Sequence, residues 1–155
     1  MPQMNKGGKF IFGKSAVGKD GLVRLPPQAV EEYRIASEGK VYLFTGSLST
    51  GGFCVTRRGL LEPSRLGHIL TENPGLLDCA LPQGAFQKYK GRWYCWTDIS
   101  EAGTIVLTGS MMDVLKLSPG DELLSIRSSD IAFTMGAKGP LLERARNYEG
   151  DIPVF

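Results

Sequence analysis

Four basic residues near the start of the chain are the side chains best suited to bind a charged partner. They are Lys14, Lys19, Arg24 and Arg34. Contacts to phosphate supply most of the sequence-independent affinity of proteins for DNA, so several cations on one face would suffice to hold a duplex. The alternative is a solvated face of ordinary lysines and arginines. We therefore predict DNA contacts at these four positions, with that alternative open.

A second group of residues interleaves aromatic and basic side chains between positions 86 and 96. Its members are Phe86, Lys88, Tyr89, Lys90, Arg92, Trp93, Tyr94 and Trp96. Rings beside cations can stack on single-stranded bases or enclose a ligand. The same pattern also arises where a linker and a strand pack against a sheet. Tyr89, Trp93 and Trp96 form the predicted patch for a ligand or partner, on the condition that their rings are exposed.

The remaining reactive residues predict no catalytic site, no metal site and no cofactor. His68 is the sole histidine, and no motif supplies the partners that a metal site or a triad would need. The Gly-Lys-Ser of residues 13–15 lacks the upstream spacing of a phosphate-binding loop. Cys54, Cys79 and Cys95 are odd in number and widely spaced, which favours buried thiols over disulfides or a metal site. We expect a protein that is not an enzyme.

Length and composition indicate one globular domain. The chain has 155 residues, of which 42% are hydrophobic and 22% charged, and this composition excludes disorder. Residues 1–77 hold 10 basic and 6 acidic side chains, whereas residues 78–155 hold 8 and 10, so an anionic partner should prefer the first half. No apolar run reaches the roughly 18 residues of a membrane span, and the first residues do not resemble a signal peptide. We expect a cytoplasmic protein that does not enter a membrane.

The elements that must position these residues occur twice. Residues 21–35 align with 103–117 at an offset of 82, and residues 51–59 align with 130–139 at an offset of 80. In each copy, two strands separated by a glycine turn precede a short helix, a hairpin and a second amphipathic helix. A unit of about 55 residues is too small to bury one apolar sheet face alone. Two units must therefore bury their apolar faces together, and the simplest product is one closed β-barrel.

The pattern also predicts where individual elements lie. The first copy is expected to form strands over 10–17 and 22–25, a helix that opens at Pro26 and Pro27, and a hairpin over 40–57. In the second copy the strands are expected over 93–99 and 104–107, the hairpin over 122–135, and the helix has Ser110 as its N-cap. Apolar spacing predicts the second amphipathic helices from Leu60, Leu61, Leu66, Ile69 and Leu70, and from Leu141, Leu142 and Ala145.

Residues 21–44 and their partner 103–126 resemble the glycine, strand, proline, helix, Gly-Asp and hairpin pattern of the AbrB/MazE/SpoVT family. The most specific piece is LSPGDELLSI, residues 117–126. Two units in one chain, each followed by a helix, are similar to the MraZ branch. The resemblance implies a mainly β fold with short helices, namely a double AbrB-like swapped-hairpin barrel that closes within one chain as a pseudo-dimer.

We expect a single barrel domain over residues 1–155. Its parts are a first unit at 9–71, a surface linker at 72–90, a second unit at 91–147 and a tail at 148–155. The resemblance implies a transcriptional regulator that binds double-stranded DNA, with homo-oligomers formed through the helices that follow the hairpins.

The residues depart from the family at its DNA-contacting positions. The basic position after the turn glycine is Leu22 in one unit and Thr104 in the other. The paired basic positions on the helix are Val30-Glu31 and Met112-Asp113. A second hypothesis therefore stays open, in which the chain retains the barrel but has lost DNA binding, and serves as a binding or assembly module for a protein or a small ligand.

Overall fold

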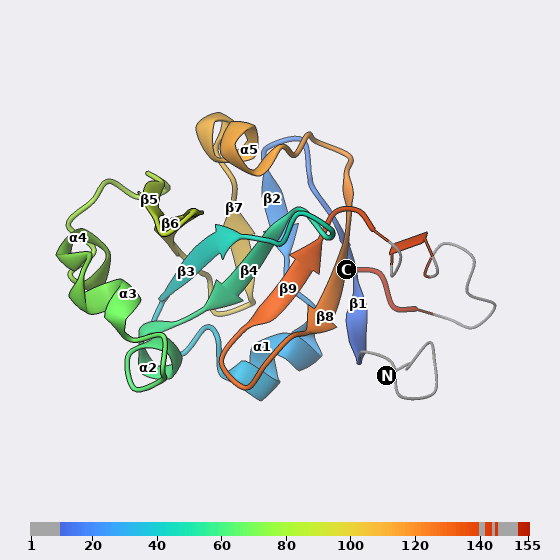
Figure 1. The fold of residues 1–155 in the computed structure, drawn as a ribbon. Coiled ribbons are helices and arrows are strands. Elements are labelled where there is room, and N and C mark those ends of the chain that lie inside the picture. The colour runs from blue at the N-terminus through green and yellow to red at the C-terminus, as the bar shows by residue number, and fades with distance from the viewer. Residues whose placement is uncertain (1–9, 140–141, 144, 146–151) are drawn as a thin grey trace.

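Seven antiparallel strands form the main sheet of the protein, and a separate two-stranded ribbon lies behind it (Figure 1). A computed structural model describes residues 10–139, 142–143, 145 and 152–155. The strands are β1 (Ile11–Ala16), β2 (Leu22–Arg24), β3 (Lys40–Thr45), β4 (Phe53–Thr56), β5 (Gln87–Tyr89), β6 (Arg92–Asp98), β7 (Thr104–Val106), β8 (Glu122–Arg127) and β9 (Phe133–Gly136). The helices are α1 (Pro27–Tyr33), α2 (Arg58–Leu61), α3 (His68–Thr71), α4 (Pro74–Leu77) and α5 (Gly109–Leu115). The prediction of a mainly β fold with short helices is confirmed.

The two copies of the repeat exchange strands with each other. The order β1, β2, α1, β3, β4 recurs as β6, β7, α5, β8, β9. Strand β1 pairs with β8 and β6 pairs with β3, so the first strand of each copy joins the hairpin of the other. Lys14 lies opposite Leu124, and Trp96 lies opposite Tyr42, which are equivalent positions at the offset of 82. The copies are therefore related by a pseudo-two-fold axis.

Two further strand pairs lie on this pseudo-axis, because each is made by equivalent strands. In the ribbon, Val23 of β2 faces Ile105 of β7. In the main sheet, Cys54 of β4 faces Thr134 of β9. Both pairs join positions that the sequence alignment equates, so the repeat found in the sequence is also a repeat of backbone pairing.

No closed barrel is found among the described residues. The hydrogen-bonded order is β1-β8-β9-β4-β3-β6-β5, and its end strands β1 and β5 do not pair. Strands β2 and β7 have three residues each and pair only with one another, so they cannot bridge the gap. The ribbon, α1 and α5 instead cover the inner face of an open sheet.

The main core lies between this inner face and the ribbon with its two helices. Its fully buried side chains include Phe12, Val23, Leu43, Phe53, Ile105 and Phe133. In the part of the chain that the structure describes, side chains cover the outer face of the sheet at its two ends. One end packs under α2 to α4 through Tyr42, Leu70, Leu76 and Trp96, and the other packs against Leu142 and Ala145. Leu141 lies outside the described residues.

The segment after the first hairpin differs from the prediction. One amphipathic helix was expected from Leu60 to Leu70, but the structure has α2 and α3 with a break between them. Pro63 lies in the break, where its ring and missing N–H prevent the helix from continuing. Residues 72–90 are also more than a surface linker, since they form α4 and β5 and bury Leu76.

The helices α1 and α5 end in the same unusual way. Each ends at a left-handed residue, which is Arg34 (φ 48°) after α1 and Lys116 (φ 57°) after α5. The N-cap of α5 is Thr108 rather than the predicted Ser110, because the Thr108 side chain accepts a hydrogen bond from the Met111 N–H at 3.3 Å. The pattern therefore located both helices, but the predicted N-cap of the second was wrong by two residues.

Candidate functional site

The β2–β7 ribbon presents one side to the core and the other to solvent. Val23 and Ile105 at its centre are buried in the main core. The outward side chains are Leu22, Arg24, Thr104 and Val106. Leu22 and Val106 are 48% and 49% exposed, an unusual exposure for two apolar side chains that face each other across a strand pair. The ribbon is therefore a candidate contact surface centred on the pseudo-axis.

Two glycine turns hold the ribbon in place. The Leu107 N–H donates to the Gly21 carbonyl at 2.8 Å, and the Leu25 N–H donates to the Gly103 carbonyl at 2.9 Å. These bonds are equivalent in the two repeats. Gly21 has a φ of +79°, and a Cβ there would lie 1.9 Å from the Leu107 carbonyl oxygen. Only glycine fits this turn, which explains the glycine that precedes the strand in the sequence.

Of the four predicted DNA contacts, two lie on the ribbon side, one before the first residue of β2 and the other at its last residue. Arg24 is exposed on β2, and Lys19 is exposed in the turn that precedes β2. Arg34 is exposed at the far end of α1. Because the chain enters α1 from the ribbon and a seven-residue helix is about 10 Å long, Arg34 lies away from the ribbon.

Lys14 lies on the opposite side of the sheet from the ribbon. Its neighbour Ser15 is buried and donates a hydrogen bond to the Arg24 carbonyl at 2.6 Å. Side chains alternate along a strand, so Lys14 points the other way, beside Leu124 of the outer face. Its Nζ lies 3.8 Å from Glu122 Oε1. The structure therefore does not bring Lys14 together with Lys19 and Arg24.

The ribbon side carries acidic residues as well as these cations. The exposed carboxylates on its turns and helices are Asp20, Glu31, Glu101 and Asp113. Glu101 stands where the first repeat has Lys19, and Val106 stands where it has Arg24. Positive charge on the ribbon thus comes from the first repeat alone.

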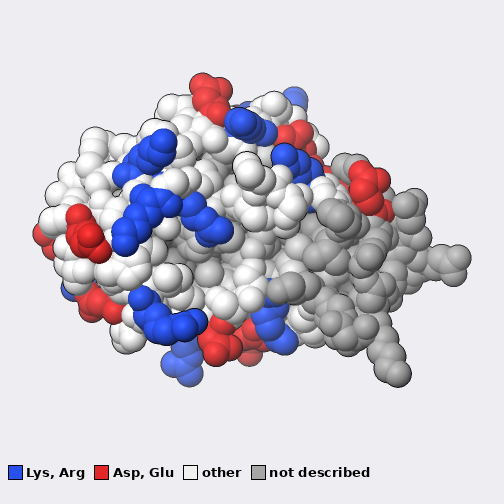
Figure 2. Space-filling model, viewed as in Figure 1, with Lys and Arg blue, Asp and Glu red and all other residues white. Residues whose placement is uncertain are grey.

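The three rings of the predicted aromatic patch lie in different environments. Trp96 is buried, and its indole N–H donates to the Leu81 carbonyl at 2.7 Å. Trp93 is 39% exposed, with Lys88 Nζ 5.9 Å from its ring centre. Figure 2 shows Lys and Arg side chains gathered over this β5–β6 end of the sheet. Of the three rings, Trp93 meets the condition of exposure, whereas Tyr89 is half-buried and Trp96 is buried.

Tyr89 belongs to a separate polar cluster that the sequence did not indicate. Its hydroxyl donates to Glu72 Oε2 at 2.6 Å and lies 2.9 Å from His68 Nδ1. The hydrogen bond to Glu72 raises the pKa of Tyr89 to about 12. In the part of the chain that the structure describes, no group of three His, Cys, Asp or Glu residues could hold a metal ion.

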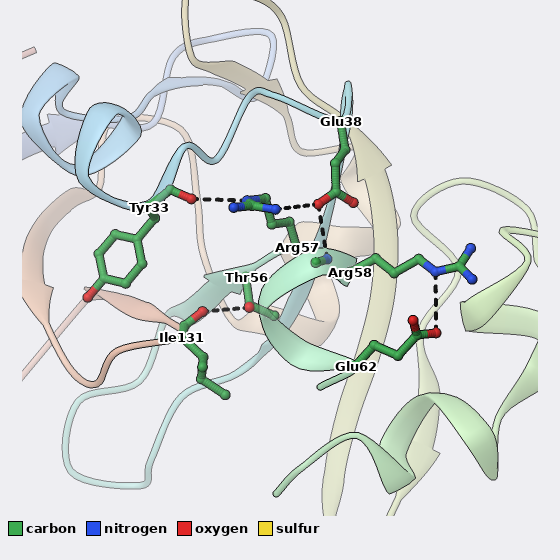
Figure 3. A network of polar contacts seen from close by, with 8 residues as sticks. Tyr33, Glu38, Thr56, Arg57, Arg58, Glu62 and Ile131 are labelled. Atoms are coloured by element: carbon green, nitrogen blue, oxygen red, sulfur yellow. Dashed lines mark hydrogen bonds and ion pairs between the residues drawn. The ribbon is translucent and has the colours of Figure 1, made fainter. Parts of the chain in front are cut away.

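Arg57, at the junction of β4 and α2, is held in the polar network of Figure 3. Its Nε donates to the Tyr33 carbonyl at 3.0 Å, and its Nη1 donates to Glu38 Oε2 at 2.6 Å. The same Glu38 oxygen accepts the Gly59 N–H at 3.0 Å. The guanidinium thus links the end of α1 to the start of α2 through its Nε and Nη1 groups.

A cavity of about 400 Å³ opens next to this network. Its lining residues are Glu38, Lys40, Val41, Tyr42, Arg58, Leu77, Asp78 and Cys79. Cys54 and Cys95 are buried as predicted, but the prediction is wrong for Cys79, whose thiol is partly exposed. Burial raises the pKa of Cys95 to about 12 and that of Cys54 above its usual value, so both are unreactive thiols. The residues that line the cavity lie between positions 38 and 79 of the sequence. No local sequence motif predicts that they come together.

Neither a family model nor a curated protein matches this chain. None of the described helices is long and apolar enough to cross a membrane. Function is therefore inferred from the geometry above and from the resemblance of the two repeats.

Proposed function

We propose that the chain is a non-enzymatic transcriptional regulator of the AbrB/MraZ type that binds double-stranded DNA. The observation that carries this proposal is the exchange of strands between the repeats. Hairpin β3–β4 lies between β6 and β9 of the second repeat, and hairpin β8–β9 lies between β1 and β4 of the first. This arrangement supports the swapped-hairpin architecture that the resemblance implies, although the sheet remains open between β1 and β5.

The β2–β7 ribbon is the proposed DNA-contacting element. A two-stranded ribbon fits the major groove of B-DNA, where apolar side chains such as Leu22 and Val106 can contact thymine methyl groups. Lys19, before the start of β2, and Arg24, at its end, would contact phosphates, and both cations come from the first repeat. The second repeat offers Glu101 in place of Lys19, so we expect an asymmetric contact with one half-site instead of a palindrome.

The test is a fluorescence anisotropy titration of a labelled duplex with the full chain at several salt concentrations. With two phosphate contacts, the logarithm of the association constant should fall with the logarithm of the salt concentration at a slope of about −2. Replacing both ribbon cations (Lys19→Ala with Arg24→Ala) should weaken binding at low salt by at least about tenfold. Replacing two hairpin cations (Lys88→Ala with Arg92→Ala) removes the same charge elsewhere and should leave the affinity within about twofold.

A chain that fails to retain duplex DNA at low salt would overturn this proposal. Equal losses in the two double variants would also overturn it, because net charge rather than the ribbon would then control binding.

The exposed β5–β6 hairpin favours a second candidate function. Lys88, Lys90 and Arg92 are exposed on it, with Lys88 over the ring of Trp93, and Lys90 and Gly91 form its tight turn. Such a surface suits an anionic, stackable partner such as single-stranded nucleic acid. In that case the hairpin double variant and Trp93→Ala, rather than the ribbon variant, should abolish binding of a labelled single strand.

A further inference from the structure

We propose that the outer edge of β1 is a strand-addition site for an extended Ile-Pro-Val-Phe segment. Residues 152–155 occupy it within the chain, and the same segment of a second copy can take their place. The Lys14 N–H donates to the Pro153 carbonyl at 2.7 Å, and the Phe155 N–H donates to the Lys14 carbonyl at 2.8 Å. Lys14 and Val154 form a parallel bridge, whereas all the named strands pair antiparallel.

Gly13 gives this site its specificity. A Cβ at Gly13 would lie 2.6 Å from Cε2 of the Phe155 ring and 2.9 Å from the Pro153 carbonyl oxygen. The glycine has a φ of +151° and lies beside an irregularity in the register of β1 with β8. Strand addition takes its affinity from main-chain hydrogen bonds and its selectivity from room for particular side chains. The missing side chain at Gly13 provides that room for an aromatic ring.

The equivalent edge of β6 shows why the β1 edge is exchangeable. There the Gly84 N–H donates to the Trp96 carbonyl at 2.9 Å, which matches the Phe155 bond to Lys14. The β6 edge is continued by β5, which the tight turn at residues 90–91 joins to β6. The β1 edge is instead closed by a short segment far away in the sequence. A second copy carries the same segment, so reciprocal exchange would reproduce every contact in a closed dimer.

The first experiment measures binding of a labelled peptide with the sequence of residues 150–155 to full-length chains by fluorescence anisotropy. The Phe155→Ala chain should bind the peptide at least about tenfold more tightly than the unaltered chain, because its own segment competes less well. Gly13→Ala, combined with Phe155→Ala, should lose that binding by at least about tenfold. Gly109→Ala is the matched control, since a Cβ at Gly109 meets nothing within 4 Å.

The second experiment measures mass by sedimentation over a range of protein concentrations. We expect a dimer that grows with concentration in the unaltered chain and in Gly109→Ala, and that is lost in Phe155→Ala. Phe155 belongs to none of the buried core clusters, so this variant should keep its circular dichroism spectrum. A monomer at all concentrations would overturn the exchange between copies. If adding Gly13→Ala to the Phe155→Ala chain left the chain folded and its affinity for the peptide unchanged, the proposed site would be overturned. Neither outcome depends on whether DNA is bound.

Discussion

The two repeats have nearly the same backbone and very different surfaces. The Val17 N–H donates to the Asp121 carbonyl at 2.9 Å, and the Ile99 N–H makes the equivalent bond to Gly39 at 3.1 Å. The side chains at equivalent positions diverge, as with Lys14 and Trp96. Shared turns and core residues therefore preserve the framework, while the residues that could bind a partner belong to one repeat or the other. Function should be sought where the repeats differ.

The largest expected effect on stability comes from replacing one of two equivalent turn glycines. Gly21 and Gly103 both have positive φ, so alanine is strained at either position. A Cβ at Gly21 would meet the Leu107 backbone, whereas at Gly103 it would lie 2.7 Å from Cγ2 of the Val30 side chain, which can move. We expect Gly21→Ala to lower the free energy of unfolding by about 3 kcal/mol or more, and Gly103→Ala by about 1–2 kcal/mol.

Urea denaturation of the two glycine variants measures this difference. A chain in which Gly103→Ala costs as much as Gly21→Ala would contradict the view that backbone contact, and not only the φ angle, requires glycine at position 21.

The regular elements of each repeat could be predicted because their causes are local. Alternation of apolar residues and the turn glycines located β2 at 22–24 and β7 at 104–106, and apolar spacing located α1 and α5. The predicted closed barrel is not found among the described residues, because closure depends on how the end strands pair, and β5 and residues 153–155 occupy those edges. Neither segment is part of the repeat.

The candidate site was less predictable because it depends on contacts between distant residues. Lys14 was grouped with Arg24 on grounds of charge, but strand alternation turns it to the other side, toward Glu122. Similarly, Trp96 was grouped with Trp93, yet its indole is buried against Leu81. Lys19 and Arg24 both lie on the ribbon side because one is in the turn before β2 and the other is on β2 itself.

A smaller effect on stability is expected from replacing Tyr42, whose equivalent in the second repeat is Leu124. The Tyr42 hydroxyl donates to the Leu76 carbonyl at 2.9 Å, and burial raises its pKa from 10.0 to about 12. Tyr42→Phe leaves that carbonyl without its partner and should cost about 1–2 kcal/mol near neutral pH. The measurement is the urea midpoint of each chain.

The pH dependence of Tyr42 has a definite sign. Above about pH 10 the phenol of the unfolded chain releases its proton, while the buried phenol retains it up to about pH 12. The folded state then binds more protons than the unfolded state, so stability falls as the pH rises through this window. The decrease in the free energy of unfolding between about pH 9 and pH 11 should be smaller in Tyr42→Phe than in the unaltered chain. An equal loss in both chains would show that other groups control the alkaline transition.

The smallest expected effect compares the starts of the two equivalent helices. The N-cap of α5 is Thr108, whose side chain accepts the Met111 N–H, whereas the N-cap of α1 is Pro26, which makes no side-chain hydrogen bond. Thr108→Ala should lower the free energy of unfolding by about 1 kcal/mol, because one N–H of the first turn loses its acceptor. Pro26→Ala should cost only about 0.5 kcal/mol, since it mainly frees the unfolded chain. Both values come from urea denaturation. If Pro26→Ala cost more than Thr108→Ala, the preset backbone of the first helix would matter more for stability than the side-chain cap of the second, contrary to this expectation.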